Sequence, residues 1–391
     1  MGVVSGDLVV RNIGRLTTWH GPVVTDAALV ARDGRVAWTG RDVDLPAQEG
    51  DVEELDAGGA AVLPGFVDCH THLVWAGSRR DDFCARLGGG GYSPGGIAST
   101  VAATRAASYD ELRTLAQQRI DSAVAHGTTT IEVKSGYGLT VDDELRLLDV
   151  AASLTGPHVA MTYLGAHVVP DGRDRGGYVA EVLRTITDAR DRGAEWCDVF
   201  CDEGAFTVDE ARRLLIGARA AGLGLRMHAE QLSHTGAAML AAELGCASAD
   251  HLDHVTADDA SALAGAGVVA VLVPVCSLYT RTQRYDHAKV LRHAGCTLAV
   301  ATDCNPGSAW TESLPYAMQL ACLGMGLDVD TVLRAATLGG AAALRRDDVG
   351  HLGVGARADL VVVDGEHEVD LLAHLGANGI NRTVVDGVSI G

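Results

Sequence analysis

Histidine and aspartate residues that could hold a metal ion or transfer protons lie at the ends of strand-like apolar runs. His70 and His72 are two residues apart near the end of the first such run, so their imidazoles project from the same face of a strand. His228, His251 and Asp303 end three later runs. This set predicts a divalent metal site that activates water for hydrolysis. The alternative is that each histidine satisfies a hydrogen bond in the core and Asp303 caps a turn.

Eight apolar runs alternate with helical patterns, which is typical of a parallel sheet with crossover helices. Helix starts are marked by Thr140 and by a Thr207–Glu210 capping box. Eight parallel strands close a TIM (β/α)₈ barrel, and the residues at the strand ends then meet at one mouth. The predicted strands are 60–73, 128–136, 158–167, 197–204, 223–230, 246–254, 267–275 and 297–307.

A doubly wound open sheet is the main alternative fold. Such a sheet normally carries a glycine-rich fingerprint directly after its first strand. Here the first strand is followed by HTHLVWAG, and the glycine run at 88–92 comes later, without the lysine of a phosphate-binding loop. We interpret that run as a mobile loop over the site.

Short β segments separated by turn residues occupy both ends of the chain. We therefore predict a small composite β-sandwich domain, made of residues 1–62 and 350–391, beside a catalytic barrel over residues 63–349. No convincing internal repeat is present.

Composition restricts the possible partners. The net charge of −20 disfavours binding to nucleic acid or to an anionic membrane. The start of the chain lacks the pattern of a secretory signal, and no apolar stretch is long enough to span a bilayer. The nine cysteines form no C-x-x-C pair. These features predict a cytoplasmic protein.

The positions of the two lysines predict the number of metal ions at the site. Binuclear barrels commonly bridge their two ions with a modified lysine at the end of strand four, but the run here, CDVFCDEG, offers Glu203 and no lysine. Of the two lysines, Lys134 falls on strand two and Lys289 in a helix. We predict one divalent ion, zinc or iron, since residue types alone do not choose between them. Its predicted ligands are His70, His72, His228 and Asp303.

Six segments, in order over nearly the whole chain, resemble the motifs of the imidazolonepropionase family within the amidohydrolase superfamily. They are PGFVDCHTHLVWAGSR (64–79), TTTIEVKSGYGL (128–139), LGAHVVP (164–170), MHAEQ (227–231), SADHL (248–252) and ATDCNPGS (301–308). The terminal GHLGVGARADLVV also resembles the β domain of the superfamily. The resemblance implies hydrolysis of 4-imidazolone-5-propanoate to N-formimino-L-glutamate in histidine degradation.

The resemblance also implies catalytic roles. Asp303 would take a proton from the attacking water and return it to the leaving nitrogen, while His251 would stabilise the oxyanion or orient the water. At position 231 some family members carry glutamate, whereas this chain has Gln231, which can hydrogen-bond the substrate ring but cannot accept a proton.

Further residues match substrate-binding positions of the family. Arg79 would hold the propionate carboxylate through two hydrogen bonds; its alternative is a surface ion pair with Asp81 or Asp82. Tyr137 and His167 would contact the ring of the substrate. The alternative is that Tyr137 only packs in its turn and His167 only satisfies a hydrogen bond in the core. The loop NPGS would donate hydrogen bonds to the ligand from Asn305, Gly307 and Ser308. The alternative is that these residues only form a tight turn after the last strand.

Two other functions stay open at this point. Another amidohydrolase, such as a formiminoglutamate or nucleobase deaminase, would use the same metal on a different substrate. A catalytically dead scaffold would be expected to lack ligands, and all four are present in the sequence. The resemblance also makes a homodimer plausible.

Overall fold

The structure is a computed structural model that describes residues 6–48, 52–89 and 96–390. Most of the glycine run predicted to cover the site lies outside these residues. Within the described part of the chain, no helix is both long and apolar enough to cross a membrane.

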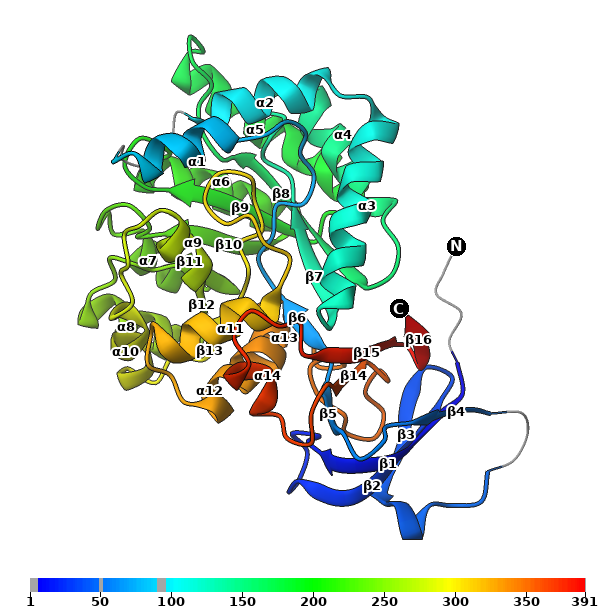
Figure 1. Cartoon of the computed structure of the whole chain (residues 1–391). Helices are drawn as coiled ribbons and strands as arrows, with labels where there is room; N and C mark the ends of the chain where they lie inside the picture. Colours follow the sequence, from blue (N-terminus) through cyan, green and yellow to red (C-terminus); the bar gives the residue numbers. More distant parts are fainter. Residues whose placement is uncertain (1–5, 49–51, 90–95, 391) are drawn as a thin grey trace.

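Eight parallel strands form the catalytic body and confirm the predicted barrel (Figure 1). They pair in chain order: β6 (Phe66–Asp68), β7 (Thr128–Lys134), β8 (His158–Ala166), β9 (Trp196–Cys201), β10 (Gly224–Ala229), β11 (Ser248–His251), β12 (Val269–Leu272) and β13 (Leu298–Val300). The ring closes beyond the last of these strands, where Thr71 and Cys304 form a parallel bridge. Closure therefore places the residues after β6 beside those after β13.

Helices follow the strands and cover the outside of the barrel (Figure 1). Thr140 and Thr207 cap the helices that follow them, and Thr207 forms the predicted capping box with Glu210. The helices are α1 (Arg80–Leu87), α2 (Ile97–Ala106), α3 (Tyr109–Ala125), α4 (Val141–Ala152), α5 (Arg175–Asp191), α6 (Val208–Ala220), α7 (Ala237–Glu243), α8 (Ala257–Ala266), α9 (Pro274–Tyr279), α10 (His287–His293), α11 (Leu314–Leu323), α12 (Val329–Arg334), α13 (Gly340–Ala343) and α14 (Asp370–Ala373), with a 3₁₀ turn at Asp42–Asp44 and a π turn at Ala335–Gly339.

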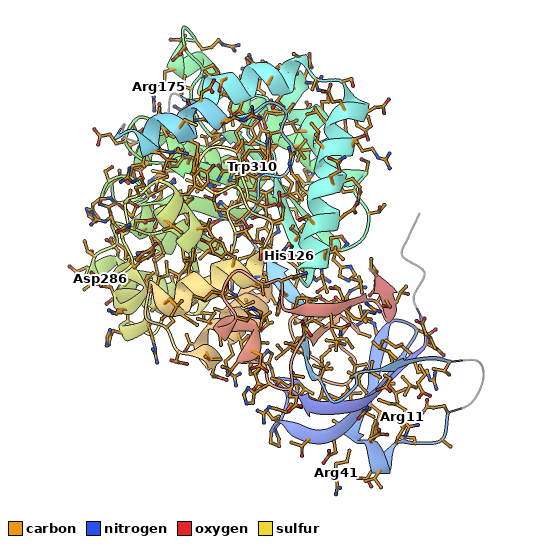
Figure 2. The ribbon with its side chains drawn as sticks, in the orientation of Figure 1. Arg11, Arg41, His126, Arg175, Asp286 and Trp310 are labelled. Atoms are coloured by element: carbon orange, nitrogen blue, oxygen red, sulfur yellow. The ribbon has the colours of Figure 1, made fainter. Side chains whose placement is uncertain are left out.

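Strands from both chain ends form one mixed sheet beside the barrel, as predicted for a composite β domain (Figure 1). Its strands are β1 (Leu8–Leu16), β2 (Val24–Arg32), β3 (Arg35–Arg41), β4 (Glu53–Asp56), β5 (Ala61–Pro64), β14 (Leu360–Val363), β15 (Ile380–Val385) and β16 (Val388–Ile390). Figure 2 marks this sheet with Arg11 and Arg41, and the barrel with Arg175 and Asp286. Side chains of these strands, Leu29 among them, form an apolar cluster separate from the core of the barrel.

The run predicted as one strand over 60–73 is divided between the two sheets. Its first part, β5, pairs with β1 and β14, and its second part, β6, begins the barrel. Gly65 stands between them, and a Cβ there would lie only 2.2 Å from Thr129 Oγ1. A continuous apolar run cannot show this division, because both parts are buried. The predicted domain boundary between residues 62 and 63 stays a prediction. Because β5 belongs to the terminal sheet and ends at Pro64, its place favours a boundary at Gly65.

Candidate functional site: a histidine–aspartate centre at the barrel mouth

His70, His72 and Asp303 meet where the barrel closes. The amide of Asp303 donates to the carbonyl of His70 at 3.0 Å, which fixes the two strand ends side by side. Asp303 Oδ1 lies 3.4 Å from Nε2 of His70 and 3.5 Å from Nε2 of His72. The two Nε2 atoms are 3.3 Å apart. Asp303, more than two hundred positions from the histidine pair in the sequence, thus presents its ligand atom to the same point as His70 and His72.

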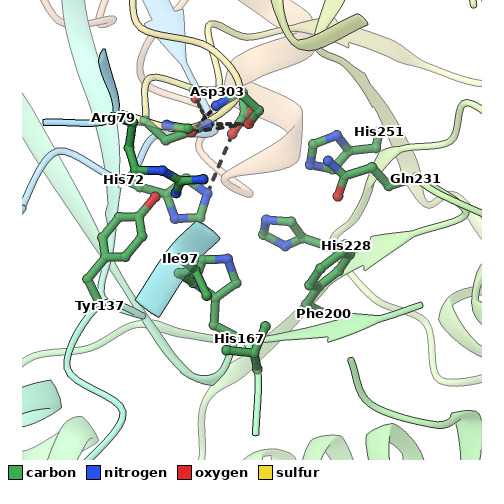
Figure 3. A pocket seen from close by; sticks show the side chains of 14 residues that line it. His72, Arg79, Ile97, Tyr137, His167, Phe200, His228, Gln231, His251 and Asp303 are labelled. Carbon is green, nitrogen blue, oxygen red and sulfur yellow. Dashed lines mark hydrogen bonds and ion pairs between the residues drawn. The ribbon is translucent and has the colours of Figure 1, made fainter. Parts of the chain in front are cut away.

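His228 and His251, at the ends of β10 and β11, join this group. The ring centroid of His70 lies 4.5 Å from that of His228 and 5.3 Å from that of His251. Ligand atoms of these three histidines lie within 4.8 Å of one another, and the same holds for His70, His72 and Asp303. Because His70 belongs to both sets, the structure brings all five residues to one place, and Figure 3 shows most of them around a common space.

The chemistry of these side chains fits a divalent ion. His228 Nε2 and His251 Nδ1 are buried and have no hydrogen-bond partner among the described residues. A buried polar atom without a partner costs free energy unless something satisfies it. Burial also lowers the pKa values of His70, His72 and His251 well below the ordinary value, so their imidazoles are neutral and keep lone pairs for coordination.

Two site residues adopt backbone conformations that are unusual for residues other than glycine. The φ angles are +54° at Asp303 and +76° at His251. Such conformations cost about 1–3 kcal/mol each and cluster at functional sites. Burial raises the pKa of Asp303 to about 7, and a cation beside this carboxylate would oppose that shift.

Arg79 lines the same pocket and is almost completely buried (Figure 3). Its Nε donates to the Asp82 carboxylate, whose side chain is 43% exposed. The ion pair considered as the alternative is therefore present, and it does not remove Arg79 from the pocket. A Cβ added to Gly307 would lie 3.1 Å from Arg79 Nη1, so the guanidinium also reaches the NPGS loop.

Tyr137 and His167 form another part of the pocket wall. Nδ1 of His167 lies 2.9 Å from the carbonyl oxygen of Gly136, so Nδ1 carries the proton and Nε2 is left as an acceptor. Burial lowers the pKa of His167 to about 4, which keeps the ring neutral. The Glu144 carboxylate accepts from three backbone amides of the turn that carries Tyr137. The turn is thus fixed by the chain itself.

Asn305, Gly307 and Ser308 line the pocket, but their polar groups bond mainly to one another. Asn305 Oδ1 accepts from the amides of Gly307 and Ser308, both at 2.8 Å. Asn305 Nδ2 donates to the Asp303 carbonyl at 2.6 Å and to Ser308 Oγ at 2.9 Å. This network stabilises the loop conformation, and the ligand-binding roles of these residues stay predictions.

Gln231 also lines the pocket, with Nε2 3.7 Å from the thiol of Cys276. The neighbouring Glu230 does not face the pocket, since its carboxylate accepts from backbone amides that include those of Thr235 and Gly236. Cys276 was not predicted at the site, and its only signal in the sequence is its position just after the seventh predicted strand. The apolar wall residues Ile97, Val168 and Phe200 were not predicted either.

Neither lysine nor glutamate bridges the site at strand four. Glu203 is exposed, and Lys134 lies inside the barrel on β7, where it bonds to Glu132 and Asp198. From the sequence, Lys134 was considered only as a bridging ligand, and these contacts were not predicted.

Comparison with known proteins agrees with this geometry. Residues 61–390 match the model of the Amidohydrolase family. An imidazolonepropionase from Saccharopolyspora erythraea is 49% identical over 91% of this chain and 92% of its own length. The chain belongs to the imidazolonepropionase family. Another imidazolonepropionase, from Salinispora arenicola, is 46% identical over 97% of this chain and 98% of its own.

Among solved structures, an adenosine deaminase from Xanthomonas campestris with bound zinc has a TM-score of 0.74, with 19% identity over 98% of this chain and 92% of that one. At this identity the likeness shows the shared amidohydrolase fold. The resemblance that the sequence motifs indicated is therefore confirmed, and the imidazolonepropionase family membership identifies the chain as a hydrolase.

Proposed function

We propose that this chain hydrolyses the cyclic amide of 4-imidazolone-5-propanoate to N-formimino-L-glutamate in histidine degradation. The observation that carries the proposal is the position of Asp303, which lies within 3.5 Å of both His70 and His72 in a pocket that Arg79 also lines. The curated relatives that bear the imidazolonepropionase name support the same substrate.

One divalent ion, zinc or iron, would be held by His70, His72, His228 and Asp303. When bound, such an ion lowers the pKa of a water ligand and polarises a carbonyl group. Three imidazoles and one carboxylate suit either metal. The zinc in the related deaminase supports zinc without excluding iron.

Proton transfer falls to Asp303 in this proposal. Its carboxylate accepts a proton from the attacking water as the water oxygen bonds to the ring carbonyl carbon. The adjacent C–N bond breaks, and the proton returns to the leaving ring nitrogen, which becomes the imino nitrogen of the formimino group. One water is consumed, and one new carboxylate is formed.

The remaining residues bind and orient the substrate. His251 is neutral, so one ring nitrogen can donate a hydrogen bond to the developing oxyanion. His167 Nε2 accepts from a ring N–H, and Tyr137 and Gln231 contact the same ring. Arg79 binds the propionate carboxylate, while Asn305, Gly307 and Ser308 hold the loop beside it.

The test is a coupled assay with the purified, metal-loaded chain. Imidazolone propanoate is generated in the cuvette by urocanate hydration, and N-formimino-L-glutamate is detected by mass spectrometry. Cytosine, guanine and N-formimino-L-glutamate are supplied separately to test deaminase activity. Turnover of any of these three without ring opening would exclude the proposed substrate.

A homodimer, a cytoplasmic location and the absence of nucleic-acid or membrane partners stay predictions. Light scattering on the purified chain tests the dimer.

A further inference from the structure

A network of charged side chains fills the barrel directly beneath the histidine–aspartate centre. We call it the buried ion cluster, and its members are Glu132, Lys134, Asp198, Arg226 and Asp250. All five side chains have no solvent exposure. None was assigned a role in the proposed reaction.

Lys134 is the centre of this cluster. Its Nζ lies 2.7 Å from Asp198 Oδ2, 2.9 Å from the Glu132 carboxylate and 3.6 Å from Asp250 Oδ2. An ammonium has three donors that point in different directions, whereas a guanidinium is planar. A lysine can therefore hold three carboxylates around one point, in a chain whose other basic residues are almost all arginine.

Arg226 supports the opposite side of the cluster. Its Nε lies 3.0 Å from Glu132 Oε1, and its Nη2 lies 3.6 Å from Asp250 Oδ2. The guanidinium also donates to the backbone carbonyls of Cys69 and Ala343. The arginine is thus fixed by the barrel wall and cannot leave the cluster without breaking these bonds.

Two carboxylates of the cluster contact the proposed metal ligands. Asp250 Oδ2 lies 2.7 Å from Nδ1 of His70, and Asp198 Oδ2 lies 3.0 Å from Nδ1 of His228. At His70 this contact is a hydrogen bond, so the ring proton lies on Nδ1 and Nε2 is free. At His228 the Asp198 carboxylate lies within ion-pair distance of Nδ1, and its charge favours the ring proton on that nitrogen. In His70, Nε2 is the atom that faces His72 and Asp303.

Stability alone does not explain such a cluster. Removing charged groups from water costs several kcal/mol per ion, and apolar side chains of similar volume often stabilise a protein equally well. When all five groups are ionised, three carboxylates and two cations carry one negative charge in excess. That charge lies beneath the imidazoles, where a bound cation would balance it.

We propose that Lys134 is a positioning residue for the metal centre: it holds Asp198 against Nδ1 of His228 and, together with Arg226, holds Asp250 against Nδ1 of His70. Each imidazole then presents Nε2 to the ion. The inference rests on the proposed function only in taking His70 and His228 as ligands.

The test measures zinc affinity of the full-length chain by competition with a chromophoric chelator. Lys134→Gln and Asp198→Asn are each expected to weaken zinc binding roughly 10- to 100-fold. Asp359→Asn is the matched control, because Asp359 is also a buried carboxylate with a histidine nitrogen, Nε2 of His158, at 3.1 Å, but it lies at the composite sheet. The control is expected to keep the zinc affinity of the parent chain, even if its melting temperature falls.

Wild-type zinc affinity in folded Lys134→Gln would overturn the inference, as would an equal loss in Asp359→Asn. If Lys134→Gln does not fold, Asp198→Asn decides, and its cobalt-loaded form should also show a shifted visible absorption band. Ring opening is assayed separately. If the parent chain binds zinc and the variants bind it more weakly, but the parent chain does not open the imidazolone ring, the proposed function is refuted. The inference about Lys134 still holds in that case.

Discussion

Replacing Arg79 with glutamine should remove the preference for a substrate that carries a carboxylate. The Arg79 side chain is 6% exposed and lines the pocket, so a carboxylate bound there would be largely withdrawn from water. A hydrogen bond to a charged group is worth about 1.5–3 kcal/mol, so kcat/KM should fall by roughly 10- to 150-fold. Most of that loss should appear in KM, because the carboxylate is remote from the bond that breaks.

The decisive assay compares two substrates on two enzymes. The parent chain and Arg79→Gln are each supplied with imidazolone propanoate and with an imidazolone that lacks the propionate chain. The parent should prefer the full substrate, and the variant should treat both nearly alike. Asp82→Asn serves as the control, since it removes the partner of Arg79 and keeps the guanidinium. If Arg79→Gln slows both substrates equally, the guanidinium does not recognise the carboxylate and the reasoning fails.

Three further predictions concern catalysis, metal and stability. Asp303→Asn should lower kcat by about 10²–10⁴-fold when measured at saturating metal with the metal content verified, and near-normal turnover would exclude proton transfer by Asp303. Dialysis against a chelator should abolish turnover and lower the melting temperature, and zinc or ferrous iron should restore both; a chain that stays active without metal would contradict the site. Arg175 lowers the pKa of Glu210 to about 2 from an ordinary value of 4.5, so this carboxylate stabilises the fold above about pH 4.5 and the contribution is lost as the pH falls toward 2. Glu210→Gln should therefore cost about 1 kcal/mol in urea unfolding near pH 7 and roughly half of that or less near pH 3, and a loss that does not change with pH would refute this.

The sequence predicted the barrel and the meeting of its ligands because both depend on periodic patterns. Alternating strands and helices indicated eight strand ends, and closure then required His70 and Asp303 to be neighbours. Thr207 and Glu210 were readable because a capping box is local. These features need only short stretches of chain or one topological rule.

The features that the sequence did not predict depend on contacts between distant side chains. Nothing near Lys134 indicates that it meets Asp198, which is 64 positions away. Asn305 Oδ1 accepts a hydrogen bond from the Gly307 amide of its own loop. This contact depends on a backbone geometry that a Pro-Gly dipeptide allows but does not require. The division at Gly65 was hidden because both flanking segments are apolar and buried.

That division makes the terminal sheet a poor candidate for exchange or removal. Only four residues lie between Gly65 and His70, and the Gly65 amide donates to the carbonyl of Asp359 in the C-terminal part of the chain. A shortened protein that begins at the barrel would free the segment 66–69, which holds His70 and His72 in place. A chimera that carries a relative's small sheet would do the same. Engineers who trim the ends of this enzyme to obtain a minimal catalyst should therefore find that metal binding is lost before the barrel itself unfolds.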